Sequence, residues 1–117
     1  MKSLLIFFLV LSAGVFSAFA PNQLFNTSLT VTVRDELGNT QDSVSVRLFL
    51  KEADFTKEEN SIAEATTDKK GVCHFKKIKP ESYYILARKG DKDNTGGGEK
   101  IGKLENGKFN KITIIIQ

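Results

Sequence analysis

The sequence contains one cysteine and one histidine, and the two are adjacent, at Cys73 and His74. A thiol beside an imidazole has the composition of a nucleophile and its general base. Neighbouring residues on a β-strand, however, point to opposite faces. Because the apolar Cys73 and Phe75 alternate with His74, we expect His74 to face solvent and Cys73 to be a buried, unreactive thiol. Dimerisation through a free thiol is the alternative.

A catalytic metal centre needs more histidine than this chain supplies. Hydrolytic zinc is held by three protein ligands, commonly two histidines and a carboxylate, around one open position. His74 is the only histidine, so such a centre cannot form within the chain. The nucleophile and base required by other hydrolases are missing as well. We therefore predict no enzymatic activity, no metal site and no cofactor.

One segment is rich in oxygen atoms that could bind calcium. Asp91, Asp93 and Asn94 precede three consecutive glycines, and Glu99 follows them. Calcium takes carboxylate and carbonyl oxygens, but the later bidentate glutamate is missing at its standard spacing. Three glycines in a row hold ligands poorly in place. We expect the loop 90–100 to be mobile and free of metal, with calcium binding as the alternative.

Three aromatic residues could contact a ligand: Phe49, Phe55 and Tyr84. Phe49 and Tyr84 fall at outward positions of expected strands. Phe55 lies in the polar segment 52–61, which could be a loop or one helical turn capped by Asp54. Carbohydrate-binding sandwiches stack sugar rings on exposed aromatics, although this chain has no Trp. These three residues form the candidate ligand-binding set.

The charge balance does not favour a nucleic acid as partner. The chain has 17 Lys and Arg against 14 Asp and Glu, and only Lys2 of these lies in the first 20 residues, so the remainder carries a net charge of +2. The lysines at 69–70 and 76–79 fall beside a turn and a strand end, where lysine is solvated and protects sheet edges. A nucleic-acid surface would need more basic charge on one face, interleaved with aromatics. We expect a protein or glycan partner.

The first 20 residues have the pattern of a secretory signal peptide. Lys2 precedes the apolar run 4–11, and small residues lead to Ala18-x-Ala20. Cleavage after Ala20 would leave Pro21 at the new terminus, which fits a signal peptidase poorly, so cleavage after Ser17 is the alternative. The run is short for a membrane span, although an uncleaved anchor is a second possibility. We expect a secreted or periplasmic protein without a stable membrane span after cleavage.

The remainder, residues 21–117, predicts one all-β domain. Apolar and polar residues alternate in short runs that are separated by turn residues such as Gly38-Asn39 and Asn106-Gly107. This pattern is typical of two antiparallel sheets packed face to face, here a seven-stranded antiparallel β-sandwich. A lone cysteine excludes an internal disulfide. The expected strands are 28–34, 43–51, 62–67, 72–76, 83–88, 101–104 and 108–117. The expected core includes Val31, Val46, Phe75, Tyr83, Ile85 and Ile114.

The spacing of residues across the domain carries a family resemblance. The residues concerned are Val31, Val33, Asp35, Gly38, Asn39, Val44, Val46, Leu48, Thr67, Asp68, Gly71, Cys73, Phe75, Ile78, Pro80, Tyr83, Ile85, Ala87, Lys89 and Gly90. With them the chain, from about residue 28 to 116, resembles a carboxypeptidase regulatory-like domain, also called prealbumin-like or transthyretin-like. It departs from that pattern at Glu81, where the family usually has glycine, and at Cys73, where a larger apolar residue is usual.

The resemblance implies a prealbumin-like sandwich that serves as an accessory, adhesive or stabilising module. Together with the missing catalytic groups, it predicts an exported, non-enzymatic β-sandwich module with an interaction or structural role in the cell envelope or outside the cell. The alternative is a small carbohydrate-binding module that uses the aromatic residues named above. Fold alone does not decide between them.

Overall fold

The computed structural model describes residues 26–117, so the predicted signal peptide and its cleavage site lie outside the described residues. In this range no helix is long and apolar enough to span a bilayer. The described chain contains eight strands and one short helix. In chain order they are β1 (Ser28–Arg34), β2 (Ser45–Phe49), α2 (Glu52–Lys57), β3 (Ala63–Thr66), β4 (Val72–Phe75), β5 (Tyr83–Lys89), β6 (Lys92–Asp93), β7 (Lys100–Ile101) and β8 (Phe109–Ile115).

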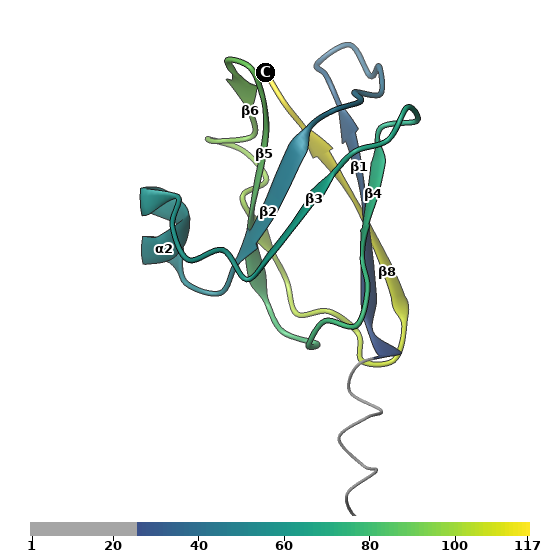
Figure 1. Ribbon diagram of the computed structural model, residues 1–117, viewed down its shortest axis with the longest axis vertical. Helices are drawn as coiled ribbons and strands as arrows, with labels where there is room; N and C mark the ends of the chain where they lie inside the picture. The colour runs from purple at the N-terminus through teal and green to yellow at the C-terminus, as the bar shows by residue number, and fades with distance from the viewer. Residues whose placement is uncertain (1–25) are drawn as a thin grey trace, which may run out of the picture.

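The strands form two sheets that face each other, which confirms the predicted β-sandwich (Figure 1). One sheet has three strands in the order β4-β1-β8. The other has five, in the order β3-β2-β5-β6, with β7 also paired to β5. Helix α2 lies outside the five-stranded sheet, against β2 and β5 (Figure 1). The sequence predicted seven strands, and the additional one is β6, a segment of two residues.

The prediction of a wholly antiparallel sandwich is wrong at one pair of strands. β8 pairs with β1 in parallel, with Ser28 opposite Phe109 and Arg34 opposite Ile115. The chain leaves β7 in the five-stranded sheet and crosses to the start of β1, so it enters β8 in the same direction as β1. Thr27 secures this crossing, since its hydroxyl accepts a hydrogen bond from the Gly107 amide at 2.8 Å. Residue alternation defines a strand's two faces but not the direction of its partner.

The core lies between the two sheets and is built as the alternation predicts. All six core residues expected from the sequence are less than 7% exposed. Leu29, Val31 and Val33 of β1 meet Val46 and Leu48 of β2 in one continuous apolar cluster. Tyr83 joins this cluster through its ring, and its hydroxyl donates a hydrogen bond to the Lys79 carbonyl at 2.6 Å. The buried tyrosine is therefore fully satisfied.

The turn before β4 explains several residues of the family resemblance. The Thr67 hydroxyl donates to the Gln41 carbonyl and accepts from the Val44 amide, at 2.8 and 2.9 Å. Gly71 has φ +78°, and a Cβ there would lie 2.8 Å from the Cβ of Thr40 and 2.9 Å from the Gln41 nitrogen. A side chain is thus excluded by space as well as by backbone conformation. Thr67 thus binds the 35–44 connection to the end of the sandwich, and Gly71 leaves the space for that connection to pass close by.

Candidate functional site

The three aromatic residues singled out in the sequence lie together on the outer face of the five-stranded sheet. Phe49 and Phe55 meet edge to face, with their ring centroids 5.8 Å apart. Phe55 and Tyr84 are also 5.8 Å apart, with their rings tilted by 32°. Leu86 of β5 completes this aromatic cluster. The sequence placed Phe49 and Tyr84 on the outer face correctly.

The expectation that Phe49 and Phe55 are open to solvent is wrong. Phe49 is fully buried and Phe55 is only 9% exposed, while Tyr84 is half-buried. The cause is α2, which lies across β2 and β5 and inserts Phe55 between the other two rings. Strand alternation shows which side chains point outward, but it does not show what covers them. Whether the three residues bind a ligand stays a prediction.

Helix α2 is held by packing and by ion pairs rather than by a side-chain cap. Its N-cap residue is Lys51, which makes no capping side-chain hydrogen bond, so Asp54 does not serve as the expected cap. Asp54 instead accepts a hydrogen bond at the other end of the helix, from Asn60 at 3.4 Å. A six-residue helix has little stability alone, so burial of Phe55 is its main support.

Glu58, at the end of α2, connects the helix to the sheet. Its carboxylate accepts hydrogen bonds from both terminal nitrogens of Arg88 and from Arg47 of β2. The hydrogen bond from Arg88, with the charges of both arginines, lowers the pKa of Glu58 below its usual value. Arg88 also contacts Asp93 at 3.4 Å. This network fixes α2 beside the loop that follows β5.

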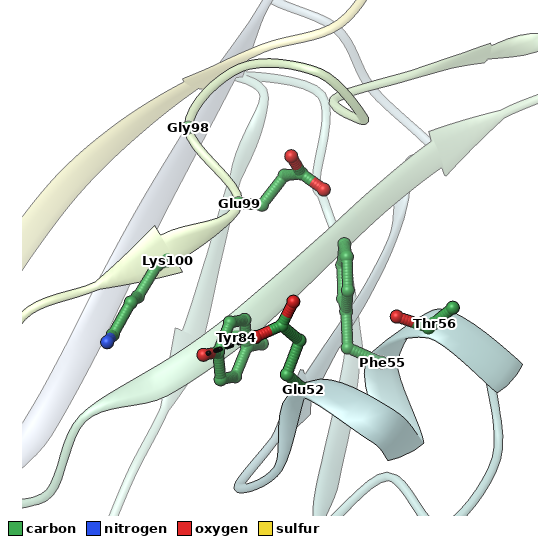
Figure 2. A pocket seen from close by; sticks show the side chains of 7 residues that line it. All are labelled: Glu52, Phe55, Thr56, Tyr84, Gly98, Glu99 and Lys100. Carbon is green, nitrogen blue, oxygen red and sulfur yellow. Dashed lines mark hydrogen bonds between the residues drawn. The ribbon is translucent and has the colours of Figure 1, made fainter.

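A groove runs along β5 between α2 and the segment that leads into β7 (Figure 2). We call it the Tyr84 groove. Its volume is about 610 Å³, and it is lined by Glu52, Phe55, Thr56, Tyr84, Gly98, Glu99 and Lys100. Figure 2 shows the carboxylates of Glu52 and Glu99 reaching into the same space from the helix and from the loop. Three separate segments of the chain therefore converge on one concave surface.

The groove offers two carboxylates, an ammonium group and an aromatic ring. The Tyr84 hydroxyl donates to Glu52 at 3.4 Å, and the Lys100 ammonium lies 5.7 Å from the centroid of the Tyr84 ring. Lys100 therefore has to move before a ligand can stack on that side of the ring. Each carboxylate has several acceptor sites, so both can still accept hydrogen bonds from hydroxyl or ammonium groups of a ligand. Of the groove residues, the sequence had named Phe55 and Tyr84 as ligand contacts and Glu99 only as a candidate calcium ligand, because these segments converge only after folding.

Besides the pairing of β6 with β5, one buried side-chain amide attaches the loop 90–100 to the sheet. Asn94 is 2% exposed; it donates to the Ile85 carbonyl at 2.9 Å and accepts from the Ala87 amide at 2.8 Å. Asp93 accepts hydrogen bonds from the amide and hydroxyl of Thr95, which lower the pKa of its carboxyl. Of the four residues considered as calcium ligands in the alternative interpretation, Asn94 and Asp93 are thus engaged with the protein itself. The mobility of the loop stays a prediction.

Cys73 and His74 lie on opposite faces of β4, as predicted. Cys73 is 3% exposed, and burial, with a smaller contribution from the charge of Asp68, raises the pKa of its thiol to about 11. His74 is exposed on the outer face, with Nδ1 2.9 Å from the Thr30 hydroxyl oxygen. A buried thiol of high pKa is a poor nucleophile. Among residues 26–117, no three His, Cys, Asp or Glu side chains gather closely enough to hold a metal ion.

Comparison with known proteins supports the fold and little more. No protein-family model and no curated protein matches the sequence. Among solved structures, the TIE protein of Bacillus anthracis is similar, with a TM-score of 0.54 and 20% identity over 77% of this chain. The match covers only 17% of the length of that protein. A candidate carbohydrate-binding protein of Pseudomonas aeruginosa has a TM-score of 0.49 and 17% identity, over 80% of this chain and 90% of its own.

These similarities bear on the family resemblance in a limited way. The TM-score of 0.54 to part of the TIE protein agrees with the sandwich fold described above. At 20% identity, the first match shows a shared fold and no shared function. Membership of the carboxypeptidase regulatory-like family stays a prediction from the residues that carry the resemblance.

Proposed function

We propose that this chain is an exported, non-enzymatic binding module that acts in the cell envelope or outside the cell, and that its partner occupies the Tyr84 groove. The observation that carries the proposal is the convergence of α2, β5 and the segment before β7 on one concave surface with charged rims. Binding sites are commonly concave, with a few polar groups that converge on the ligand. The ion pairs of Glu58 keep α2, and so one wall of the groove, in place.

The non-enzymatic part of the proposal is supported by where the reactive side chains lie. Cys73 points into the core, and His74 points out of the opposite sheet from the groove. The groove itself is lined by neither a cysteine nor a histidine. Its side chains therefore suit recognition by hydrogen bonds and charge more than covalent catalysis.

Site-specific crosslinking tests for a protein partner. A photoreactive amino acid in place of Thr56, which lines the groove, should capture one partner from an envelope extract, and Tyr84→Ala should strongly reduce the capture. The same photoreactive residue at Thr113, on the other sheet, is the matched control and should not capture that partner. Equal capture from both positions would contradict a specific role of the groove.

A glycan is the second candidate ligand, because two carboxylates, those of Glu52 and Glu99, line the same groove as the Tyr84 ring. Carboxylates accept hydrogen bonds from hydroxyls, and aromatic rings offer an apolar face to a sugar. A glycan array would show saturable binding that is lost in both Tyr84→Ala and Glu52→Gln and kept in Lys103→Ala. Absence of binding on the array, with a partner captured at Thr56, would favour the protein partner.

Export is tested separately. The pattern of residues 1–20 predicts that N-terminal sequencing of the exported protein begins between Ala18 and Asn22. A protein that still begins at Met1 after secretion or fractionation would contradict cleavage and favour an N-terminal anchor.

A further inference from the structure

The outer face of the three-stranded sheet is basic, and no helix of the described residues covers it, so we call it the bare face. Its central strand, β1, presents the hydroxyls of Ser28, Thr30 and Thr32 outward, since Leu29, Val31 and Val33 point into the core. In the register, Thr30 lies between His74 of β4 and Lys111 of β8. The outward positions of these three strands, all within the described chain, hold no carboxylate.

The lower half of this face forms a groove of about 880 Å³, which we call the basic groove. Ser28 and Thr30 form its floor, and Lys76, Lys77 and Lys111 stand at its sides. None of the three lysines makes an ion pair with another described residue. The groove therefore has hydrogen-bonding groups at its base and uncompensated positive charge along both edges.

Phe109 is a large apolar residue at an exposed position of this face, where a polar residue would be better solvated. Its side chain is 84% exposed, and it pairs with Ser28 at the start of β8, at the wall of the basic groove. The equivalent outward positions of β1 are all polar. A large ring among lysines and hydroxyls provides an apolar contact next to charged ones, the combination that suits a ligand with both a ring face and an anionic group.

We propose that the basic groove binds an anionic polysaccharide, with the acidic groups held by Lys76, Lys77 and Lys111 and a sugar ring resting on Phe109. Charge complementarity selects an anion. Lys111 and Lys76 belong to strands on either side of β1, so their backbones are on the order of 10 Å apart. A polymer with charges at intervals fits such a groove better than a single small anion, because several weak contacts then act together.

Other polyanions fit less well. A bilayer surface is flat, whereas this surface is concave and bears one large exposed ring, that of Phe109. Single-stranded nucleic acids stack successive bases on several large aromatic rings. Among the described residues that line this groove, Phe109 is the one Phe, Tyr or Trp, and His74 is the only other ring. The site lies on the sheet opposite to the Tyr84 groove, so it does not depend on the proposed partner there. The proposal rests on the proposed export in one respect: export decides in which compartment the protein encounters the polysaccharide.

Calorimetric titration of the purified protein with polygalacturonate tests the proposal, with neutral dextran as the control polymer. We expect saturable binding to polygalacturonate that weakens with added salt, and none to dextran. The double change Lys76→Glu and Lys111→Glu should weaken binding by about tenfold or more, since repulsion replaces attraction at two points. Phe109→Ala should weaken it by several-fold.

The matched control is Lys57→Glu with Lys103→Glu, which alters the net charge equally but away from the groove. This control and Tyr84→Ala should bind polygalacturonate as the unchanged protein does. Equal losses in both double variants would show unspecific attraction and overturn the proposal. Tighter binding of polyphosphate, single-stranded DNA or anionic phospholipid vesicles would overturn the choice of a polysaccharide, and unchanged binding by Phe109→Ala would overturn the ring contact. Failure of the Tyr84 groove tests would leave these outcomes untouched.

Discussion

The two sheets of this sandwich present outer faces of opposite character. The five-stranded sheet is covered by α2, which buries an aromatic cluster and is fixed by the ion pairs of Glu58. No helix of residues 26–117 covers the three-stranded sheet, and its outer face carries hydroxyls, lysines and an exposed ring. Phe49 and Phe109 both point outward from their strands, yet Phe49 is 0% exposed and Phe109 is 84% exposed. An outward position is therefore not the same as an exposed one.

The difference arises in the connections rather than in the strands. The chain between β2 and β3 forms α2, which folds back and covers Phe49. The chain between β1 and β2 instead makes a hydrogen-bonded turn, in which the Asp35 carboxylate accepts from the amides of Leu37 and Asn39. That turn stays at the end of the sandwich. Consequently one sheet uses its outer aromatics for stability, and the other keeps its ring available for contact.

The largest expected contrast is in stability. Phe49→Ala should lower the free energy of unfolding by about 3–5 kcal/mol, because it empties a fully buried site beneath α2. Phe109→Ala should change it by less than about 0.5 kcal/mol, since the ring is already in water. Urea unfolding of both variants measures the two values. Similar losses would show that Phe109 packs against something in solution, and the contrast between the faces would fail.

The sequence predicted the strands and the inner core well, because both follow from local alternation. Val31, Val46 and Phe75 are buried as expected, and His74 is exposed as expected. The cover over Phe49 was not predictable, since it depends on where the segment 52–61 folds. The same limit applies to the parallel pairing of β8, which depends on the path of the chain between sheets.

The candidate sites were predictable only in part, for the same reason. Tyr84 and Phe55 were recognised as aromatics, but Glu52, Glu99 and Lys100 join them through long-range folding. The sequence analysis interpreted Lys76 as a solvated lysine at the end of a strand. Only the register of β4 and β8 on β1 brings it, with Lys111 and Phe109, to one groove. Residue type identified members of the sites, and tertiary structure assembled them.

A contrast of intermediate size concerns the loop beside the covered face. Asn94→Ala should lower the free energy of unfolding by about 1–3 kcal/mol, because it leaves the Ile85 carbonyl and the Ala87 amide without their buried partner. Asp91→Ala, at an exposed position of the same loop, is the control and should have little effect. Thermal unfolding of both variants measures this. Equal stability of the two would show that the amide does not anchor the loop.

The smallest contrast depends on pH and on Glu58. The arginines beside it lower its pKa in the folded protein, so the carboxylate stabilises the fold above the ordinary glutamate pKa of 4.5. This stabilisation is lost as the pH falls through the lower pKa of the folded state, where the carboxyl takes up a proton in both states. Because the Glu58 side chain is 38% exposed, solvent screening keeps the effect below about 1 kcal/mol.

Glu58→Gln should therefore be slightly less stable than the unchanged protein at neutral pH, and the gap should close as the pH falls below 4.5. Lys111→Gln, on the bare face, serves as the control, since Lys111 makes no ion pair with another described residue. It should leave the acid dependence of unfolding unchanged. Urea unfolding measured at a series of pH values gives both comparisons. A gap that widens in acid for Glu58→Gln, or an equal closing for both variants, would place the acid-sensitive contact elsewhere than between α2 and its sheet.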